Sequence, residues 1–98
     1  MPIVALTIEL SIPLSRSLKD RRQVVRSLKD RLRQGFNISV SELDEAITWQ
    51  SATLGIAAIS SSRDYLRGLM AEVEQAAVRL AAENGAEVRD AFWDFVES

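Results

Sequence analysis

The sequence predicts an α+β protein with a ferredoxin-like fold: a four-stranded antiparallel sheet that carries two helices on one face. Three observations support this prediction. The elements follow the order β-α-β-β-α-β, both predicted helices have one apolar side, and 98 residues suffice for one hydrophobic core but not for two ordinary domains. Hydrophobic residues make up 47% of the chain and charged residues 27%, which is typical of a folded globular protein. We therefore expect one domain over residues 1–98.

The first strand is predicted over residues 3–12, where large apolar side chains alternate with smaller or polar ones. Its core candidates are Val4, Leu6, Ile8, Leu10 and Ile12. The opposite face includes Ile3, Ala5 and Thr7, and the helices would leave it uncovered, so that it is solvated, covered by a loop or used for association. Pro13 ends the strand because proline has no N–H group to donate.

The first helix is predicted to begin near Leu18 and to be ended by Gly35. Ser17 is a suitable N-cap, Asp20 approximates a capping box with it, and Gly35 suits a left-handed C-terminal cap. At 100° per residue, one arc of about 120° gathers the predicted core residues of this helix. These are Leu18, Val24, Val25, Leu28 and Leu32.

The remaining elements are a strand over 36–41, a connection over 43–51, a strand over 52–60, a second helix capped by the serines at 60–62 and stopped at 84–85, and a strand over 86–96. The last strand has the weakest alternation. Its predicted apolar positions include Val88, Phe92 and Val96.

Composition excludes several chemistries. The chain has no cysteine and no histidine, which removes disulfides, thiolate metal sites, cysteine nucleophiles and the commonest general base. No catalytic motif is present, and we expect no enzymatic activity, no cofactor and no metal. The first residues lack a basic segment and include Glu9, and no apolar run approaches the roughly 20 residues that span a bilayer. We expect a cytoplasmic protein without a membrane partner.

The charge of the chain is segregated. The net charge is −2, but residues 16–33 hold eight of the twelve basic residues against two acids and so carry +6. On the first helix, the spacing of three and four residues places five basic side chains within about 80° of one another. This predicted basic stripe consists of Lys19, Arg22, Arg26, Lys29 and Arg33. Asp20, Asp30 and Arg31 are predicted to point elsewhere.

Two interpretations of the basic stripe stay open. It is either a solvated helix face whose long side chains cover apolar surface, or a ridge of about 20–25 Å that contacts successive nucleic-acid phosphates. In the second case RNA or a ribosomal particle is the partner.

Arg21 falls in the middle of the apolar arc, and a guanidinium cannot simply be buried without a partner. Since it lies in the first turn, it could reach past the helix end toward Ser15, Arg16 and Ser17. These four residues, together with free N–H groups of the helix N-terminus, could then hold a phosphate or a carboxylate. The alternative is a capped, solvated loop.

Three further features have a functional and a structural interpretation. Glu42, Asp44 and Glu45 could bind a hard cation, but their spacing matches no known calcium loop and favours a solvated turn. Trp49 could stack on a base or cover apolar surface of the open sheet. Trp93 is better explained as a core or interface residue.

The motifs SLKDRR (17–22), FNISVSELD (36–44), WQ (49–50) and LGIA (54–57) resemble those of the YlxP-like family of small bacterial proteins of unknown function. The resemblance covers residues 3 to about 61 and includes Lys19, Arg21 and Arg22, whereas Ser51 replaces a common arginine and residues 83–98 differ. It implies a ferredoxin-like fold without established activity. Family genes often neighbour those of translation factors, which suggests a role around ribosomal RNA by association.

Our expectation is a non-enzymatic RNA-binding or ribosome-associated protein that uses the basic stripe. The alternatives are a protein-interaction module, most simply a homodimer through the open sheet face or a strand edge, and a small anion-binding enzyme at the loop before the first helix.

Overall fold

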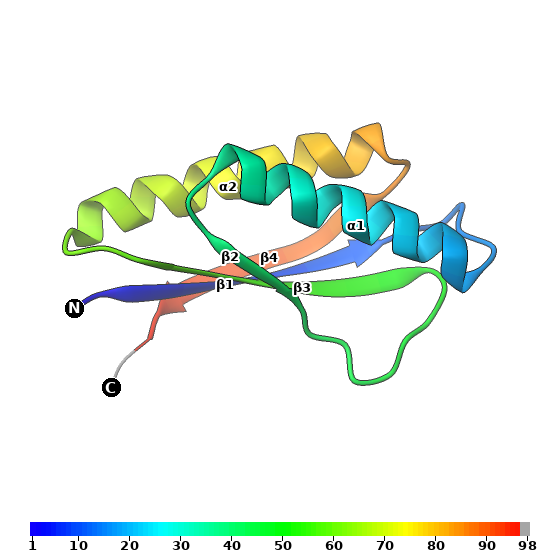
Figure 1. Ribbon diagram of the computed structural model, residues 1–98, viewed down its shortest axis with the longest axis horizontal. Coiled ribbons are helices and arrows are strands. Elements are labelled where there is room, and N and C mark those ends of the chain that lie inside the picture. Colours follow the sequence, from blue (N-terminus) through cyan, green and yellow to red (C-terminus); the bar gives the residue numbers. More distant parts are fainter. Residues whose placement is uncertain (97–98) are drawn as a thin grey trace.

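A computed structural model describes residues 1–96 and confirms the ferredoxin-like α+β fold. Its elements are β1 (Ile3–Ser11), α1 (Leu18–Gly35), β2 (Ser39–Glu42), β3 (Ser51–Ile59), α2 (Arg63–Glu83) and β4 (Glu87–Phe95). The four strands form one antiparallel sheet in the order β2-β3-β1-β4. Both helices lie on the same face of this sheet (Figure 1). The opposite face, below the sheet in this view, carries no helix.

The core forms where the even-numbered residues of β1 meet the two helices. All five predicted core residues from this part of the chain are at most 2% exposed: Val4, Leu6, Ile8, Leu10 and Ile12. They pack in one cluster with buried residues of β3 and of both helices. As predicted, the odd-numbered residues of β1 lie on the open face, because side chains alternate along a strand.

The end of α1 differs from the prediction. Gly35 does not adopt a left-handed conformation; Phe36 is the C-cap, in extended conformation, and its N–H group donates to the carbonyl of Leu32 at 3.1 Å. The left-handed glycine is Gly85, with φ +72°, directly after α2, as predicted for that helix.

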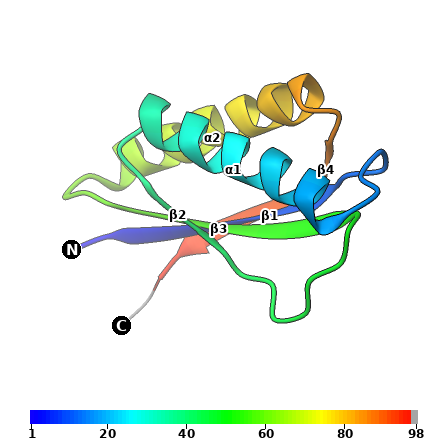
Figure 2. The ribbon, with the colours of Figure 1, turned by 45° about the vertical axis from the view of Figure 1, so that its right-hand side comes forward.

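The second strand also begins later than predicted. Residues 36–38 form the turn out of α1, in which the Ile38 N–H group donates to the Phe36 carbonyl. Pairing with β3 starts at Ser39, opposite Ala57, and ends at Glu42. The strand is therefore only four residues long. The connection that follows turns away from the helices, past the plane of the sheet (Figure 2).

A β-bulge explains the weak alternation of β4. The pairing with β1 shifts between Glu9 and Leu10, and Arg89 has no partner residue in the ladder. Val88 packs against the core before the bulge, whereas the inward residues after it are Ala91, Trp93 and Phe95. The predicted apolar positions Phe92 and Val96 are instead 53% exposed, because one extra residue moves the following side chains to the other face. Trp93 packs against the core, as predicted.

Leu18 was predicted to face the core but is 47% exposed. In the first turn of α1 the buried position belongs to Arg21, and Leu28 is the fully buried leucine two turns later. The helix therefore begins with a charged rather than an apolar side chain against the sheet.

This difference can be tested with two leucine variants. We expect Leu28→Ala to lower the free energy of unfolding by about 2–5 kcal/mol, because it leaves a cavity in the core. Leu18→Ala should lower it by less than about 1 kcal/mol, since much of the side chain is already solvated. Urea denaturation measures both values. Equal losses for the two variants would contradict the structure.

Candidate functional site

A groove runs along α1 on the side of β2. Its volume is about 440 Å³, and four of the five residues of the basic stripe line it. They are Arg22, Arg26, Lys29 and Arg33. The structure thus brings together the side chains that the helical spacing had grouped. Lys19 lies outside the groove, in a shallower neighbouring hollow that it shares with Arg22 and Arg26.

Three apolar side chains also line the groove. Leu18 and Val25 contribute from α1, and Ile47 contributes from the connection between β2 and β3. Ile47 is 55% exposed, so that its side chain is largely accessible to solvent. The groove therefore combines a cationic rim with a wall that the long arginine stems can cover.

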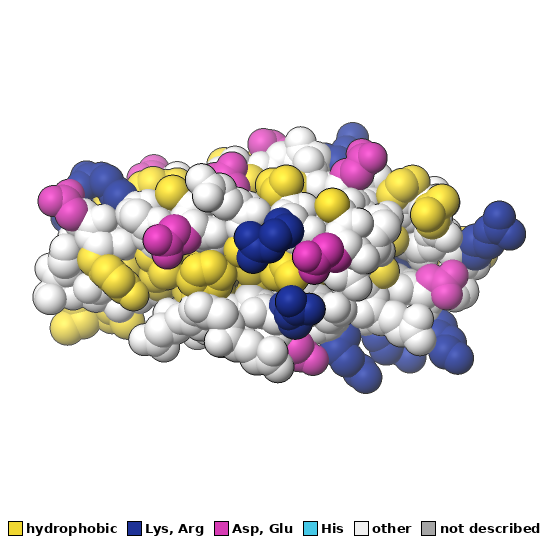
Figure 3. All heavy atoms as spheres, turned by 90° about the horizontal axis from the view of Figure 1, so that it is seen from above, with side chains coloured by type: hydrophobic (Ala, Val, Ile, Leu, Met, Phe, Trp, Pro, Cys, Tyr) yellow, Lys and Arg dark blue, Asp and Glu magenta, His cyan; other side chains and the backbone are white. Residues whose placement is uncertain are grey.

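The basic side chains of the stripe are available to a ligand. Within residues 1–96, none of the five forms an ion pair with an acidic side chain at 4.0 Å or less. All are exposed except Lys29, which is half-buried. Seen from above the helices, several basic side chains lie toward the end of the molecule where α1 begins, and others lie near the middle and at the opposite end (Figure 3).

The groove is not free of acid, which corrects one detail of the sequence analysis. Asp30 was predicted to point away from the stripe, but it lines the groove together with Glu42. Asp30 follows Arg26 by four residues and precedes Arg33 by three, so it is a neighbour of both on the helix surface. Asp30 reduces the positive potential of the groove without an ion pair to the basic stripe, and Glu42 pairs with Arg21 at one end of it.

Arg33 has a structural role besides its place in the groove. Its Nη2 donates to the carbonyl oxygen of Val40 at 2.7 Å. This bond joins the last turn of α1 to the edge strand β2 and closes one end of the groove.

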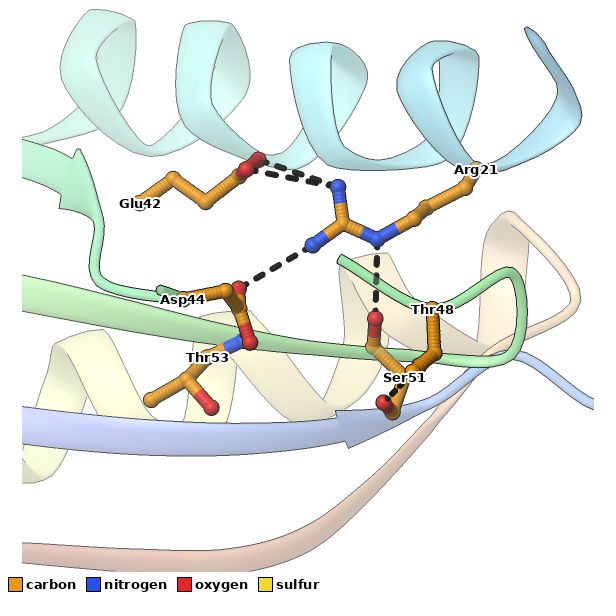
Figure 4. A network of polar contacts seen from close by, with 6 residues as sticks. All are labelled: Arg21, Glu42, Asp44, Thr48, Ser51 and Thr53. Carbon is orange, nitrogen blue, oxygen red and sulfur yellow. Dashed lines mark hydrogen bonds and ion pairs between the residues drawn. The ribbon is translucent and has the colours of Figure 1, made fainter. Parts of the chain in front are cut away.

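Arg21 closes the other end, and it is only 4% exposed. Its Nε donates to the carbonyl of Ser51 at 2.9 Å, and its Nη1 lies 3.2 and 3.3 Å from the two carboxylate oxygens of Glu42. Its Nη2 donates to Asp44 at 3.0 Å (Figure 4). The same oxygen of Asp44 accepts the Thr53 N–H group at 2.9 Å. The guanidinium is thereby paired with two carboxylates and a carbonyl.

The predicted grouping of Arg21 with the preceding loop is therefore wrong. Its side chain points toward β2 and β3, because the carboxylates of Glu42 and Asp44 compensate the charge of the buried guanidinium there. Ser17 is the N-cap, as predicted, and accepts the Asp20 N–H group at 3.1 Å.

The loop residues satisfy one another. The Arg16 N–H group donates to Asp20 at 3.0 Å, and the buried Ser15 donates its hydroxyl to the carbonyl of Ser17. Anion binding by Ser15, Arg16 and Ser17 stays a prediction, now without the cation that Arg21 would have supplied.

The acidic cluster has a different role from the one weighed for it. Glu42 and Asp44 hold Arg21, while Glu45 is exposed. In the described part of the chain, no group of three or more potential ligands could hold a metal ion. Sequence reasoning missed this pairing. The signal for it was Arg21 on the apolar arc of the first helix, together with the two acids Glu42 and Asp44 at the end of the second strand.

Trp49 is 54% exposed and lies outside the groove, on the far side of the connection between β2 and β3. Neither α1 nor α2 is long and apolar enough to cross a membrane.

The fold and the groove define a small ferredoxin-like α+β protein with a basic surface on its first helix. The chain belongs to the family described as "protein of unknown function (DUF503)", which matches residues 3–91. It is 47% identical over 47 residues to the uncharacterized protein YlxP of Bacillus subtilis (strain 168), a match that covers 48% of this chain and 51% of YlxP. The resemblance seen in the sequence motifs is thus confirmed.

Solved structures show the same fold at low sequence identity. The chain matches part of the M20-family peptidase YxeP of Bacillus subtilis with a TM-score of 0.64, at 13% identity, over 96% of this chain and 25% of the peptidase. It also matches a designed protein with a ferredoxin fold, with a TM-score of 0.54, at 9% identity, over 98% of this chain and 84% of the design. These likenesses concern the fold alone.

The role of Arg21 can be tested by Arg21→Met, which keeps most of the side-chain volume but leaves two carboxylates and one carbonyl without their partner. We expect a loss of about 3 kcal/mol in the free energy of unfolding, measured by urea denaturation. Arg22→Met, one residue further on the exposed side, is the matched control and should change stability by less than about 0.5 kcal/mol. If Arg21→Met were as stable as the control, the ion pair would not hold these elements together.

Proposed function

We propose that this protein binds RNA through the groove along α1, as a non-enzymatic accessory protein associated with the ribosome. The observation that supports this most is the arrangement of four basic side chains along one groove, without ion pairs to the described residues of the chain. Arg22, Arg26 and Lys29 can therefore exchange water for phosphate oxygens, and Arg33 can do so with the N–H groups that it does not donate to Val40.

The chemistry of the rim suits phosphate. Three of its four cations are arginines, whose planar guanidinium binds two phosphate oxygens at once. Residues 22–33 extend over about 16 Å of helix at 1.5 Å per residue, which leaves room for several backbone phosphates. Because the chain as a whole has a net charge of −2, attraction to RNA comes from this surface and not from the whole molecule. The ribosomal part of the proposal rests on the gene neighbourhood implied by the family resemblance.

This proposal predicts a strong dependence of RNA affinity on salt. If four phosphates are contacted, log affinity should fall with log salt at a slope of about −3, since each contact releases a counterion. Arg22→Glu with Arg26→Glu should abolish binding. The matched control is Arg31→Glu with Arg79→Glu, which makes the same change in net charge at exposed positions that do not line the groove. Fluorescence anisotropy with a labelled RNA measures both effects.

A control that binds no better than the groove variant would show that net charge, not the groove, determines affinity. Absence of binding to RNA and to ribosomal particles at low salt would overturn the proposal. A pull-down from cell extract with and without nuclease identifies the partner, because an RNA-dependent partner is lost after nuclease treatment.

A second candidate is a homodimer through the open sheet face, without a role in nucleic-acid binding. The observation that favours it is a set of apolar side chains exposed on that side: Ile3, Ile59, Phe92 and Val96. Pairing through a strand edge is less favoured. On β2 the carbonyl of Val40 is already bonded to Arg33, and on β4 two N–H groups donate to the carboxylates of Asp90 and Asp94.

Sedimentation of the pure protein tests this candidate. A dimer through the sheet face should dissociate in Phe92→Asp, because a charge in the centre of an apolar contact is desolvated without a partner. Tyr65→Asp, on an equally exposed aromatic of α2, should leave the dimer unchanged. A wild-type protein that sediments only as a monomer would eliminate the candidate.

A further inference from the structure

A second hollow lies on the open side of the sheet, at the end where the connection between β2 and β3 returns. Its volume is about 570 Å³, within the range of roughly 300–1,000 Å³ that is typical of sites for small ligands. The residues that matter for its chemistry are Ser11, Thr48, Trp49, Ser51 and Arg89. This set combines one aromatic ring, one guanidinium and three hydroxyl groups.

Trp49 supplies an aromatic surface that the fold does not use. Its side chain is 54% exposed, and it is not among the side chains that pack against the core. Exposed tryptophan surfaces stack well on nucleobases, since every base has a π face, and such stacking contributes strongly to single-strand binding.

The backbone next to Trp49 is held by its neighbour Gln50. The side-chain amide of Gln50 donates to the carbonyls of Pro13 at 3.1 Å and Ser15 at 3.3 Å, and the carbonyl of Gln50 accepts the Ile12 N–H group at 2.8 Å. Three hydrogen bonds thus tie the connection to the end of β1. The backbone of this connection, held by these hydrogen bonds, loses little conformational entropy when a ligand binds.

Arg89 reaches the same hollow because of the β-bulge. It is the residue of β4 without a partner in the ladder, and bulges of this kind redirect a side chain. Its side chain is exposed and forms no ion pair within residues 1–96. A guanidinium beside an aromatic ring is suited to the phosphate of a nucleotide whose base stacks on that ring.

The hydroxyl groups complete the polar lining. Ser11 and Ser51 face each other across β1 and β3, and the hydroxyl of Thr48 lies 2.6 Å from that of Ser51. Each hydroxyl can donate or accept, so that the three can adapt to the edge of a base or to a sugar.

Consecutive residues of the connection between β2 and β3 line the groove along α1 and the hollow. Ile47 lines the groove, whereas Thr48 and Trp49 line the hollow. Arg21 belongs to the groove, yet its Nε holds the carbonyl of Ser51, whose side chain lines the hollow. A strand whose phosphates lie along α1 therefore has a short path across the connection to Trp49.

We infer that this hollow binds a nucleobase with its phosphate: Trp49 stacks on the base of an unpaired RNA nucleotide and Arg89 contacts the phosphate. The RNA source of this nucleotide rests on the function proposed above. The same chemistry could be supplied by a free nucleoside monophosphate, and the experiment distinguishes the two sources.

The test uses tryptophan fluorescence in a Trp93→Phe background, so that Trp49 is the single reporter. Adenosine, AMP and a single-stranded RNA oligonucleotide are titrated separately. We expect quenching of Trp49 by AMP and by the RNA. Arg89→Ala should weaken AMP binding but not adenosine binding. By anisotropy, Trp49→Ala should lower RNA affinity about tenfold, and Trp49→Phe should restore most of it.

Matched controls are Tyr65→Ala and Arg79→Ala, which remove an exposed aromatic ring and an exposed guanidinium from α2 and should have no effect. Circular dichroism confirms that each variant is folded. If Trp49→Ala does not fold, the comparison of Trp49→Leu with Trp49→Phe replaces it, because both retain an apolar side chain and only one retains the ring.

The outcomes separate this inference from the proposed function. Both proposals are supported if RNA quenches Trp49 in the protein with an intact groove and if Arg22→Glu with Arg26→Glu abolishes RNA binding. Quenching by AMP in a protein that binds no RNA supports the hollow with a free nucleotide and overturns the proposed function. RNA binding that neither quenches Trp49 nor responds to Trp49→Ala overturns the inference and leaves the proposed function standing. Absence of any quenching with absence of RNA binding overturns both.

Discussion

The buried guanidinium of Arg21 is the interaction on which the rest of this surface depends. It binds the end of β2 through Glu42, the following connection through Asp44 and the start of β3 through the carbonyl of Ser51. These segments are 21 to 30 residues away in the sequence. A buried ion pair of this kind contributes less to stability than its Coulomb energy suggests, because both partners lose their hydration. What it provides is position: the groove exists because α1 is fixed beside β2 at both ends, by Arg21 and by Arg33.

The connection between β2 and β3 is the second consequence of that arrangement. With Asp44 and Ser51 held, the residues between them turn past the plane of the sheet (Figure 2) and present Ile47 to one side and Trp49 to the other. This connection therefore forms one wall of the groove along α1 and one wall of the hollow beside Trp49.

The sequence alone predicts those features that depend on neighbours along the chain. Alternation gives β1, capping serines give the start of both helices, and a spacing of three and four residues groups the basic stripe, which the groove largely confirms. Features that depend on distant partners could not be obtained this way. The direction of Arg21 was determined by acids more than 20 residues away, and the inward face of β4 by an extra residue at Arg89 that only strand pairing reveals. The prediction that Leu18 faces the core was wrong for the same reason. The buried position in the first turn of α1 belongs to Arg21, whose partners lie far away in the sequence.

The edges of the sheet affect how readily the protein aggregates in a crowded cell. Open strands act as templates on which other chains assemble, and a sheet with one face open to solvent, on which Ile3, Ile59 and Phe92 are exposed, is subject to this hazard. Here the short β2 has one carbonyl occupied by Arg33, and β4 combines a bulge with two aspartates whose carboxylates occupy neighbouring N–H groups. Backbone-driven growth is thereby obstructed at both borders. Recognition by backbone pairing at these edges is therefore disfavoured relative to recognition through side chains.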